Sequence, residues 1–491
     1  MEGERVVVKS AAELAADKER AELLAELDAL GGADSVESTA QSASDDALLE
    51  PQSDAPPKRR GRPPGSGTGQ PRARRTSLSD SPLANPNTAI HLLAQQVQNY
   101  LYFPEPDPLY VVLGTLAGNM MKGNPIWMML VGSPSSGRTL VLETLEHIEG
   151  IHIIGAIKSP SSLISGVSKK DVVKGATGGI LRSIGDHGMM VMKDFTSMLS
   201  MPREAMAESI GALREIYDGR YSRPLGADGG RVLEWTGKVG FIGACTPELD
   251  RHSKAIGDLG ERWVYYRYVS DDGEDYGKTM KALANRNPKA MMEELRSRVG
   301  SFIGTLNAEW NSQGGMDSRE LTQREASKVY ALAAIVTSVR SGAPRDWGTR
   351  EINGFAVKEG SARVGTVLGQ LYLGLEAIGL AEGERWRIVQ KVAMDSAPQL
   401  RMAVVLAIRA SKTLEGYQAP ITQKAIRSYM GGGIGKLTVK ETIQVLVLHN
   451  VVQRYNAKEA RMDVGEDEDG VNAGYGLTDW AEGLFLKAGI R

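Results

Sequence analysis

The sequence contains little cysteine, histidine or phenylalanine, and its apolar residues do not gather into one long run. Cys245 is the single cysteine among 491 residues, which excludes an intramolecular disulfide framework and a cysteine-cluster zinc site and fits a reducing, cytoplasmic compartment. The six histidines do not have metal-ligand spacing such as H-E-x-x-H. Because no run of about eighteen apolar residues occurs, and the charged start differs from a signal peptide, we expect no membrane partner.

Charge is distributed unevenly at the start of the chain. Residues 1–57 are mainly acidic, whereas residues 58–75 are basic, rich in glycine and proline, and without acidic side chains. Such a stretch cannot bury a core, so we expect residues 1–85 to form a disordered tail. Within it, residues 57–64 (PKRRGRPP) resemble an AT-hook. The motif's core, here Arg60-Gly61-Arg62, would lie in the narrow minor groove of A·T-rich DNA. The alternative is an unspecialised basic linker or a targeting tag.

Residues 132–139 match the phosphate-binding pattern G-x-x-x-x-G-K-[ST] at every defined position but one, because Arg138 replaces the lysine. The two glycines allow backbone N–H groups to close around phosphate oxygens, and the final hydroxyl can bind Mg²⁺. A buried strand is predicted over 126–131 and a helix from Leu140, which is the expected context. The alternative is a glycine-rich turn that binds nothing. The predicted nucleotide-binding residues of the loop are Gly132, Ser133, Pro134, Ser135, Ser136, Gly137, Arg138 and Thr139.

Three later segments fit a nucleotide-binding α/β domain. An apolar run over 189–192 predicts a strand that delivers Lys193 and Asp194 beside the phosphates. Two polar segments that meet at a glycine-rich stretch, 226–230, predict a hairpin. A buried strand predicted over 238–247 ends on Thr246, and Arg262 precedes the aromatic strand 263–268.

The order of these segments resembles an AAA+ ATPase, and most closely the minichromosome-maintenance (MCM) helicase branch, over residues 105–380. The stretch 188–195 (GMMVMKDF) is similar to that branch's second acidic motif, and Thr246-Pro247 to its sensor 1 Asn-Pro. Residues 260–263 match the Ser-Arg-Phe of the arginine finger, and Arg363 matches the sensor 2 arginine. The chain also resembles phage or bacterial ATP-binding proteins with a Lys-Asp-Phe-Thr-Ser motif, here residues 193–197.

This resemblance implies ATP and Mg²⁺ as cofactors, a homo-oligomer such as a hexamer, and DNA in a central channel. The implied catalytic residues are Asp194, Arg262, Thr246 and Arg363. Thr139 and Asp194 would hold Mg²⁺, and Lys193 would contact the nucleotide. The implied DNA contacts around the hairpin are Arg220, Arg223, Arg231 and Lys238. Three of these assignments have an alternative in which the residues have no role in catalysis or DNA binding. Arg262 could form a surface salt bridge, Thr246 could be only a strand-end hydroxyl, and the basic residues could form a solvated face.

Two departures from the family pattern bear on activity. Lys193 stands where the family has its Mg²⁺-associated aspartate, and an ammonium has no lone pair with which to bind a metal. Either Lys193 contacts phosphate in place of the missing loop lysine, or the register slips and Asp194 takes the metal, leaving no general base. Arg138 keeps the positive charge with a bulkier, differently directed group. Nucleotide binding is therefore predicted more firmly than hydrolysis.

The rest of the chain is predicted to be mainly helical. Helices over 278–295, 324–341 and 364–380 fit an AAA+ lid. Helices over 397–411, 421–429 and 437–449, with a strand over 451–455 and a hairpin, resemble a winged helix. Its predicted phosphate contacts are Lys436 and Lys440; the alternative is a domain for protein contacts only. The predicted fold class is therefore α/β, with a disordered tail (1–85), an AAA+ P-loop core (86–274), a helical lid (275–385) and a C-terminal winged-helix-like domain (386–491).

Two functions of different classes fit these features. The first is an oligomeric, helicase-like ATPase that remodels DNA in replication or repair. The second is a DNA-bound, nucleotide-gated adaptor or helicase loader that hydrolyses ATP slowly or not at all. The finger and the hairpin favour the first function, whereas Arg138 and Lys193 favour the second.

Overall fold

The structure is a computed structural model that describes residues 86–166, 178–224, 232–252, 262–269, 272–312, 318–346, 348–411, 420–456 and 473–490. The predicted DNA contacts at Arg60, Gly61, Arg62 and Arg231 lie outside these ranges. The predicted disordered tail and the glycine-rich hairpin loop lie outside them as well.

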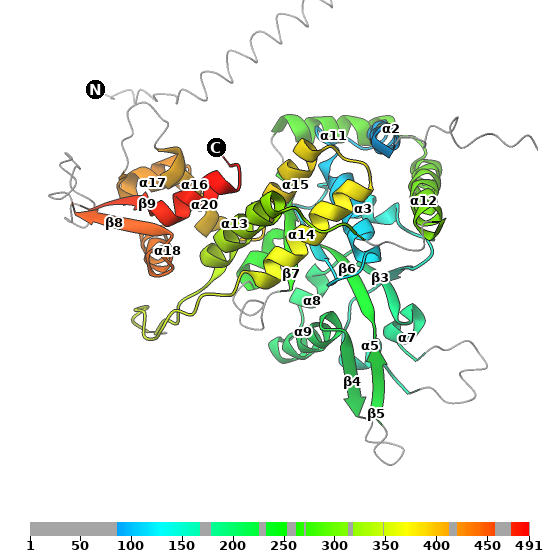
Figure 1. Cartoon of the computed structure of the whole chain (residues 1–491), viewed down its shortest axis with the longest axis horizontal. Coiled ribbons are helices and arrows are strands. Elements are labelled where there is room, and N and C mark those ends of the chain that lie inside the picture. The colour runs from blue at the N-terminus through cyan, green and yellow to red at the C-terminus, as the bar shows by residue number, and fades with distance from the viewer. Residues whose placement is uncertain are drawn as a thin grey trace, which may run out of the picture. The chain divides into compact units, whose positions relative to one another are not determined.

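Five parallel strands form the central sheet in the order β2-β3-β6-β1-β7 (Figure 1). The strands are β1 (Trp127–Val131), β2 (Ile151–Ile154), β3 (His187–Met192), β6 (Lys238–Cys245) and β7 (Trp263–Arg267). Since all run the same way, their carboxyl ends share one edge of the sheet, here called the carboxyl edge, and their starts share the opposite, amino edge. The predicted strands 126–131, 189–192, 238–247 and 263–268 are confirmed, and β2 was not predicted.

The two faces of the sheet are covered by separate hydrophobic cores. Met128 and Leu130 of β1 pack in the core that contains α3 (Asp107–Met120) and α14 (Ala362–Ala377). Trp127, Met129 and Val131 pack in the core that contains α8 (Thr196–Leu199) and α9 (Arg203–Tyr217). Every residue of β1 is buried, which explains why a parallel strand appears in the sequence as a continuous apolar run.

The predicted hairpin is present between α9 and β6. Strands β4 (Arg220–Pro224) and β5 (Val232–Thr236) pair antiparallel, with Arg220 opposite Thr236 and Pro224 opposite Val232. Figure 1 shows the two strands extending away from the sheet beside α9. Because β5 leads directly into β6, the base of the hairpin lies at the amino edge of the sheet.

The region after the sheet is helical, as predicted, but one predicted helix is wrong. Residues 278–295 are divided between α11 (Asp272–Ala284) and α12 (Pro288–Ser312). Proline disfavours helical backbone at the preceding residue and fits the first position of a new helix, so the chain breaks before Pro288. Helix α13 (Gln323–Arg340) begins at a capping box formed by Thr322 and Glu325.

Helix α15 (Glu382–Asp395) crosses the predicted boundary at 385/386 and joins the last strand of the sheet to the region that follows. The backbone N–H of Arg267 donates to Asp395 Oδ2 at 2.7 Å, and that of Tyr265 donates to Ser396 Oγ at 2.9 Å. These bonds satisfy N–H groups on the outer side of the edge strand β7.

Three helices and a strand pair follow in the predicted order. They are α16 (Gln399–Ala410), α17 (Gln423–Tyr429), α18 (Lys436–Leu448), β8 (Val452–Asn456) and β9 (Ala473–Leu477), and β8 and β9 pair antiparallel. A final helix, α20 (Asp479–Lys487), was not predicted; Thr478 caps it by accepting a hydrogen bond from the Ala481 N–H at 3.1 Å. The fold is therefore α/β with a helical C-terminal region.

The described residues all belong to one compact unit, Arg75–Arg491. Among the helices described in it, none is long and apolar enough to cross a membrane.

Candidate functional site

The predicted phosphate loop follows β1 at the carboxyl edge and requires both of its glycines. A side chain at Gly132 would place its Cβ 2.7 Å from Ser136 Oγ and 3.0 Å from Tyr268 Cβ. Gly137 has a φ of 88°, a left-handed conformation that glycine adopts without strain. The helix that follows, α4 (Arg138–Glu143), begins two residues earlier than predicted and is six residues long.

Arg138 folds back over the loop. Its Nη1 donates to the carbonyl of Gly132 at 2.5 Å, to the carbonyl of Ser133, and to Ser136 Oγ at 3.2 Å. Partial burial lowers the pKa of the guanidinium from its ordinary value. Its Nε is buried and has no hydrogen-bond partner among the residues that the structure describes. A buried donor of this kind fits an anion such as a phosphate oxygen.

A cavity of about 490 Å³ opens beside the loop. Its walls are residues 100–103, residues 135–140 of the loop, and side chains of α11 and α12, among them Lys278, Lys281 and Met291. The Gln98 side chain donates to the Phe103 carbonyl at 2.9 Å, and Lys281 donates to the Asn99 carbonyl at 3.0 Å. The cavity therefore joins an apolar, aromatic wall to the glycine-containing loop and Arg138.

The aromatic wall was not predicted as part of the site. Its signal in the sequence is the cluster Tyr100-Leu-Tyr-Phe103, which directly precedes a proline-rich break. In the fold, the ring of Tyr102 lies so close to Gly277 of α11 that a Cβ there would be 2.4 Å from it. This contact brings the helix against the segment and closes one side of the cavity.

Lys193 follows β3 at the carboxyl edge but is directed toward α4 and the turn after it. Its Nζ donates to Glu146 Oε1 at 2.8 Å and to Glu143 Oε1 at 3.4 Å. These carboxylates raise the pKa of Lys193, and the lysine lowers the pKa of Glu146. Arg296 of α12 also pairs with Glu146. The charge that Lys193 brings to the site in place of an aspartate is therefore balanced by two carboxylates.

Asp194 and Thr246 lie at the same edge, joined through Thr196. The exposed carboxylate of Asp194 accepts the Thr196 N–H at 3.0 Å, and Thr196 Oγ1 accepts the Thr246 N–H at 3.1 Å. A third bond, from the Phe195 N–H to the Ala244 carbonyl at 2.7 Å, fixes the end of β3 against β6. The structure thus places the loop, Asp194 and Thr246 at a common edge, as the sequence predicts.

Arg262 lies at the opposite edge. It precedes β7, whose first residue, Trp263, pairs with Trp127 at the start of β1. Its side chain is only 7% exposed, and its Nη2 is 3.0 Å from Asp218 Oδ2. The guanidinium also lies over the ring of Tyr217, 5.7 Å from its centre. Arg262 therefore forms a salt bridge within the chain, as the alternative proposed, but its side chain is buried rather than at the surface.

Arg363, the predicted sensor 2 residue, lies in the same region as Arg262. Burial raises the pKa of Tyr217 to about 12, and both Arg363 and Arg262 are close enough to its hydroxyl to oppose that rise. Both predicted catalytic arginines thus lie near Tyr217, the last residue of α9.

The basic residues predicted around the hairpin have different surroundings. Arg220 is exposed, and Arg223 donates to the Ile164 carbonyl at 3.1 Å. Lys238 is the first residue of β6, and its Nζ donates to the Met121 carbonyl at 2.5 Å. Burial lowers the pKa of Lys238 to about 8. Arg220 therefore remains a DNA candidate with an accessible side chain, whereas Lys238 is directed into the protein.

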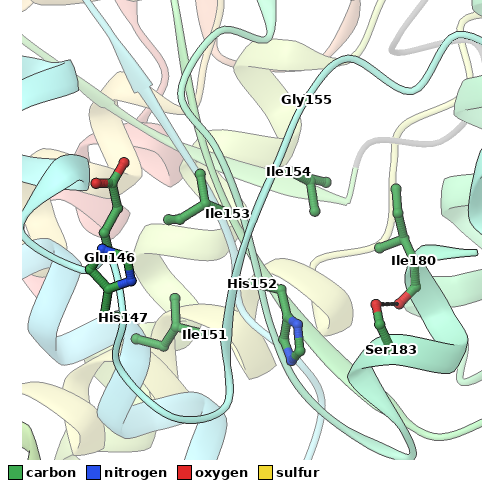
Figure 2. Close-up of a pocket in the computed structure, with 9 residues that line it drawn as sticks. All are labelled: Glu146, His147, Ile151, His152, Ile153, Ile154, Gly155, Ile180 and Ser183. Atoms are coloured by element: carbon green, nitrogen blue, oxygen red, sulfur yellow. Dashed lines mark hydrogen bonds between the residues drawn. The ribbon is translucent and has the colours of Figure 1, made fainter. Parts of the chain in front are cut away.

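A second, more open cavity of about 770 Å³ lies at the edge strand β2. Figure 2 shows Ile151 and Ile153 on the side of Glu146 and His152 on the side of Ser183. This cavity is larger, but β3 and β6 separate its strand from β1. Its described lining consists of four isoleucines with Glu146, His147, His152, Gly155 and Ser183 and includes no residue of the phosphate-binding pattern, so the cavity at the phosphate loop is the better functional candidate.

Comparison of the chain with protein-family models and with curated proteins found no match. Within the described ranges, no group of three or more histidine, cysteine or acidic residues could hold a metal ion. That finding is compatible with a nucleotide-bound Mg²⁺, which takes most of its ligands from phosphates and water.

Proposed function

We propose that this protein binds a nucleoside triphosphate, ATP, and acts as an oligomeric AAA+ ATPase on DNA, similar to the MCM branch. The observation that carries the proposal is the cavity at the phosphate loop, which adjoins an aromatic wall on one side and a buried, unpaired Arg138 Nε on the other. A purine needs an apolar or aromatic surface, and a triphosphate needs glycine-rich backbone and a cation.

The residues present fit the two cofactors. The base would lie against Tyr102 and Met291, and the loop backbone with Arg138 would hold the phosphates. Thr139, half-buried at the start of α4, and the exposed Asp194 would hold Mg²⁺. A bound Mg²⁺ would supply positive charge against the negative charge that develops on the phosphates in hydrolysis. Within the chain, Arg138 orients the phosphates, while the Thr196 bond keeps Asp194 in place.

The strand order supports a shared catalytic edge. Strand β6 lies between β1 and β3 in the sheet. Thr246, the residue that follows β6, therefore lies between the phosphate loop after β1 and Asp194 after β3. A hydroxyl there can sense the outer phosphate or position a water molecule beside it. Arg262 is at the other end of the sheet. It precedes the strand residue that pairs with the first residue of β1, and β1 rises about 13 Å from its first to its last residue at about 3.3 Å per residue. An arginine in that place would serve the site of a neighbouring subunit.

DNA binding is proposed for three surfaces: the hairpin with Arg220 and Arg223, the winged-helix-like region with Lys436 and Lys440, and the tail segment 57–64. Lys440 is exposed and Lys436 half-exposed on α18, as a helix that contacts phosphates requires.

The second candidate, a nucleotide-gated adaptor with little hydrolysis, is favoured by one observation. Lys193 is committed to Glu143 and Glu146, which leaves Asp194 as the only carboxylate that follows β3 directly. If Asp194 holds Mg²⁺, water has no second carboxylate there to act as its base.

Thermal unfolding with and without Mg·ATP tests the proposal. We expect stabilisation of roughly 3 kcal/mol at a hundredfold excess of ATP over its dissociation constant. Tyr102→Ala should reduce this stabilisation, and Tyr276→Ala, on an exposed face of α11 outside the cavity, should not. An unchanged melting temperature of the wild type at millimolar ATP would overturn the proposal. Phosphate release measured with and without DNA then separates the ATPase from the adaptor.

A further inference from the structure

We propose that Asp218 is a positioning residue that holds Arg262 in a resting position and releases it when the hairpin of the same subunit contacts DNA. The released guanidinium would then reach the phosphates of nucleotide bound by the neighbouring subunit. This inference rests on the proposed function and adds to it a route from the DNA surface of one subunit to the nucleotide site of the next.

The first step concerns the resting position of Arg262. Its side chain is 7% exposed, whereas the carboxylate of Asp218 is 57% exposed. The pair has one short contact, 3.0 Å from Nη2 to Oδ2, and one longer contact, 3.4 Å from Nη2 to Oδ1. Arg262 is thus covered by its own subunit, and a residue that must touch a neighbour's phosphates has to leave this position.

The second step concerns the place of Asp218. It is the residue directly after α9, and its N–H still bonds to the helix, to the Arg214 carbonyl at 3.1 Å, while the Gly219 N–H donates to the Ile216 carbonyl at 3.0 Å. Gly219 follows with a φ of 84°, and Arg220 begins the hairpin strand β4. Asp218 is therefore separated from the exposed basic side chain of Arg220 by a single glycine, whose backbone conformation most residues cannot adopt.

The third step is the connection across the base of the hairpin. The Gly237 N–H donates to the Gly219 carbonyl at 3.1 Å, and the Trp235 indole donates to the Gly185 carbonyl at 2.6 Å. A side chain on Gly237 would lie 2.3 Å from the Asp186 carbonyl oxygen. The hairpin base is consequently packed without spare room, so a displacement of the strands is transmitted to Asp218 rather than absorbed in a gap.

The pairing has a definite electrostatic consequence. While Asp218 accepts from Arg262, the guanidinium is partly neutralised and directed away from any neighbouring phosphate. Neutralising Asp218 removes the Coulombic part of that attraction, while the contact with the Tyr217 ring, 5.7 Å away, is unaffected. Arg262 then spends more of its time available to the neighbouring site.

The test is the rate of ATP hydrolysis by the full-length protein with and without duplex DNA. In Asp218→Asn we expect the rate without DNA to rise about fivefold and the stimulation by DNA to fall by the same factor, as for a typical coupling between two sites. Asp218→Ser is a second neutral variant, and Asp218→Glu, which keeps the charge, should retain the low rate without DNA. Glu215→Gln is the matched control, because it neutralises an exposed carboxylate on the same helix.

Each outcome is decisive. If both neutral variants fold and keep the wild-type rate of ATP hydrolysis and its stimulation by DNA, Asp218 does not keep Arg262 in a resting position and the inference is wrong. If they lose activity as Arg262→Ala does, Asp218 supports the active position and the inference is equally wrong. A wild type that binds no ATP overturns the proposed function as well, and the melting curves above detect that case separately.

Discussion

Lys193 Nζ lies 2.8 Å from Glu146 Oε1 in an ion pair that joins the end of β3 to the turn after α4. In the resemblance to the MCM branch noted from the sequence, a carboxylate would stand in the place of Lys193. The structure accounts for the cation by supplying two carboxylates, of Glu143 and Glu146, and Arg296 completes the group. The lysine at position 193 is therefore one member of a group of four paired charged side chains.

The first prediction concerns the substitution Lys193→Asp. From the sequence, this change is expected to rebuild an acidic pair with Asp194 and to increase dependence on Mg²⁺. The structure alters that expectation, because the new carboxylate would lie beside Glu143 and Glu146. We expect a loss of about 1–3 kcal/mol of unfolding free energy, measured by urea denaturation, because breaking a half-buried pair leaves unpaired like charges.

Lys193→Met is the control for that experiment. It removes the ammonium without adding a carboxylate, so its loss of stability should be smaller than that of Lys193→Asp. Equal stability of Lys193→Asp and the wild type would show that Glu143 and Glu146 do not depend on this lysine.

The second prediction concerns Lys238 and pH. Burial lowers its pKa to about 8 from an ordinary value of 10.5. Between these two values the unfolded chain binds more protons than the folded chain, so the contribution of Lys238 to stability rises with pH. Relative to Lys238→Met, the wild type should gain about 1–2 kcal/mol between pH 8 and pH 10.5, measured as the difference in unfolding free energy.

DNA affinity gives a second measurement on the same variant. Because the Lys238 ammonium donates to the Met121 carbonyl, Lys238→Met should bind DNA as tightly as the wild type, whereas Arg220→Ala should bind more weakly. If both variants lost DNA affinity to the same extent, Lys238 would have to be counted among the residues that contact DNA.

The third prediction places Arg262 in a neighbour's site. Arg262→Ala should leave ATP affinity near the wild-type value and lower turnover, because a finger stabilises charge that develops in the transition state. Thr139→Ala subunits, with an intact Arg262, should restore part of the activity when mixed with Arg262→Ala subunits. Absence of rescue in oligomers shown to contain both variants would argue against a shared site.

Much of the sheet could be predicted from the sequence for a simple physical reason. Strands β1 and β6 are buried on both faces, so their residues form continuous apolar runs that end at turn signals. Strand β2 was missed because its four residues, all half-exposed at the sheet edge, include His152 and give no comparable run.

The side-chain partners of the site could not be predicted. The distance from Lys193 to Glu143 and Glu146 depends on how α4 packs beside β3, some fifty residues away in sequence. The aromatic wall at Tyr102 forms only because α11 packs against it. The helix predicted from the sequence ran through Pro288 and so did not give the bounds of α11. Arg262 illustrates the same limit, since its pattern indicates a finger while Asp218, its partner, belongs to another segment.

The last prediction concerns the tail segment outside the described residues. Arg60 and Arg62 flank Gly61 in a stretch with the composition of a minor-groove binder, and narrow A·T-rich grooves concentrate the negative potential that attracts guanidinium groups. Replacing both arginines by alanine should weaken binding to an A-tract duplex more than binding to a G·C duplex, measured at one salt concentration. Replacing Arg72 and Arg74 instead removes the same charge from the same tail and should weaken both duplexes equally. If the Arg60 and Arg62 variant also loses affinity equally for both duplexes, the segment is a basic tether without preference for A·T-rich DNA.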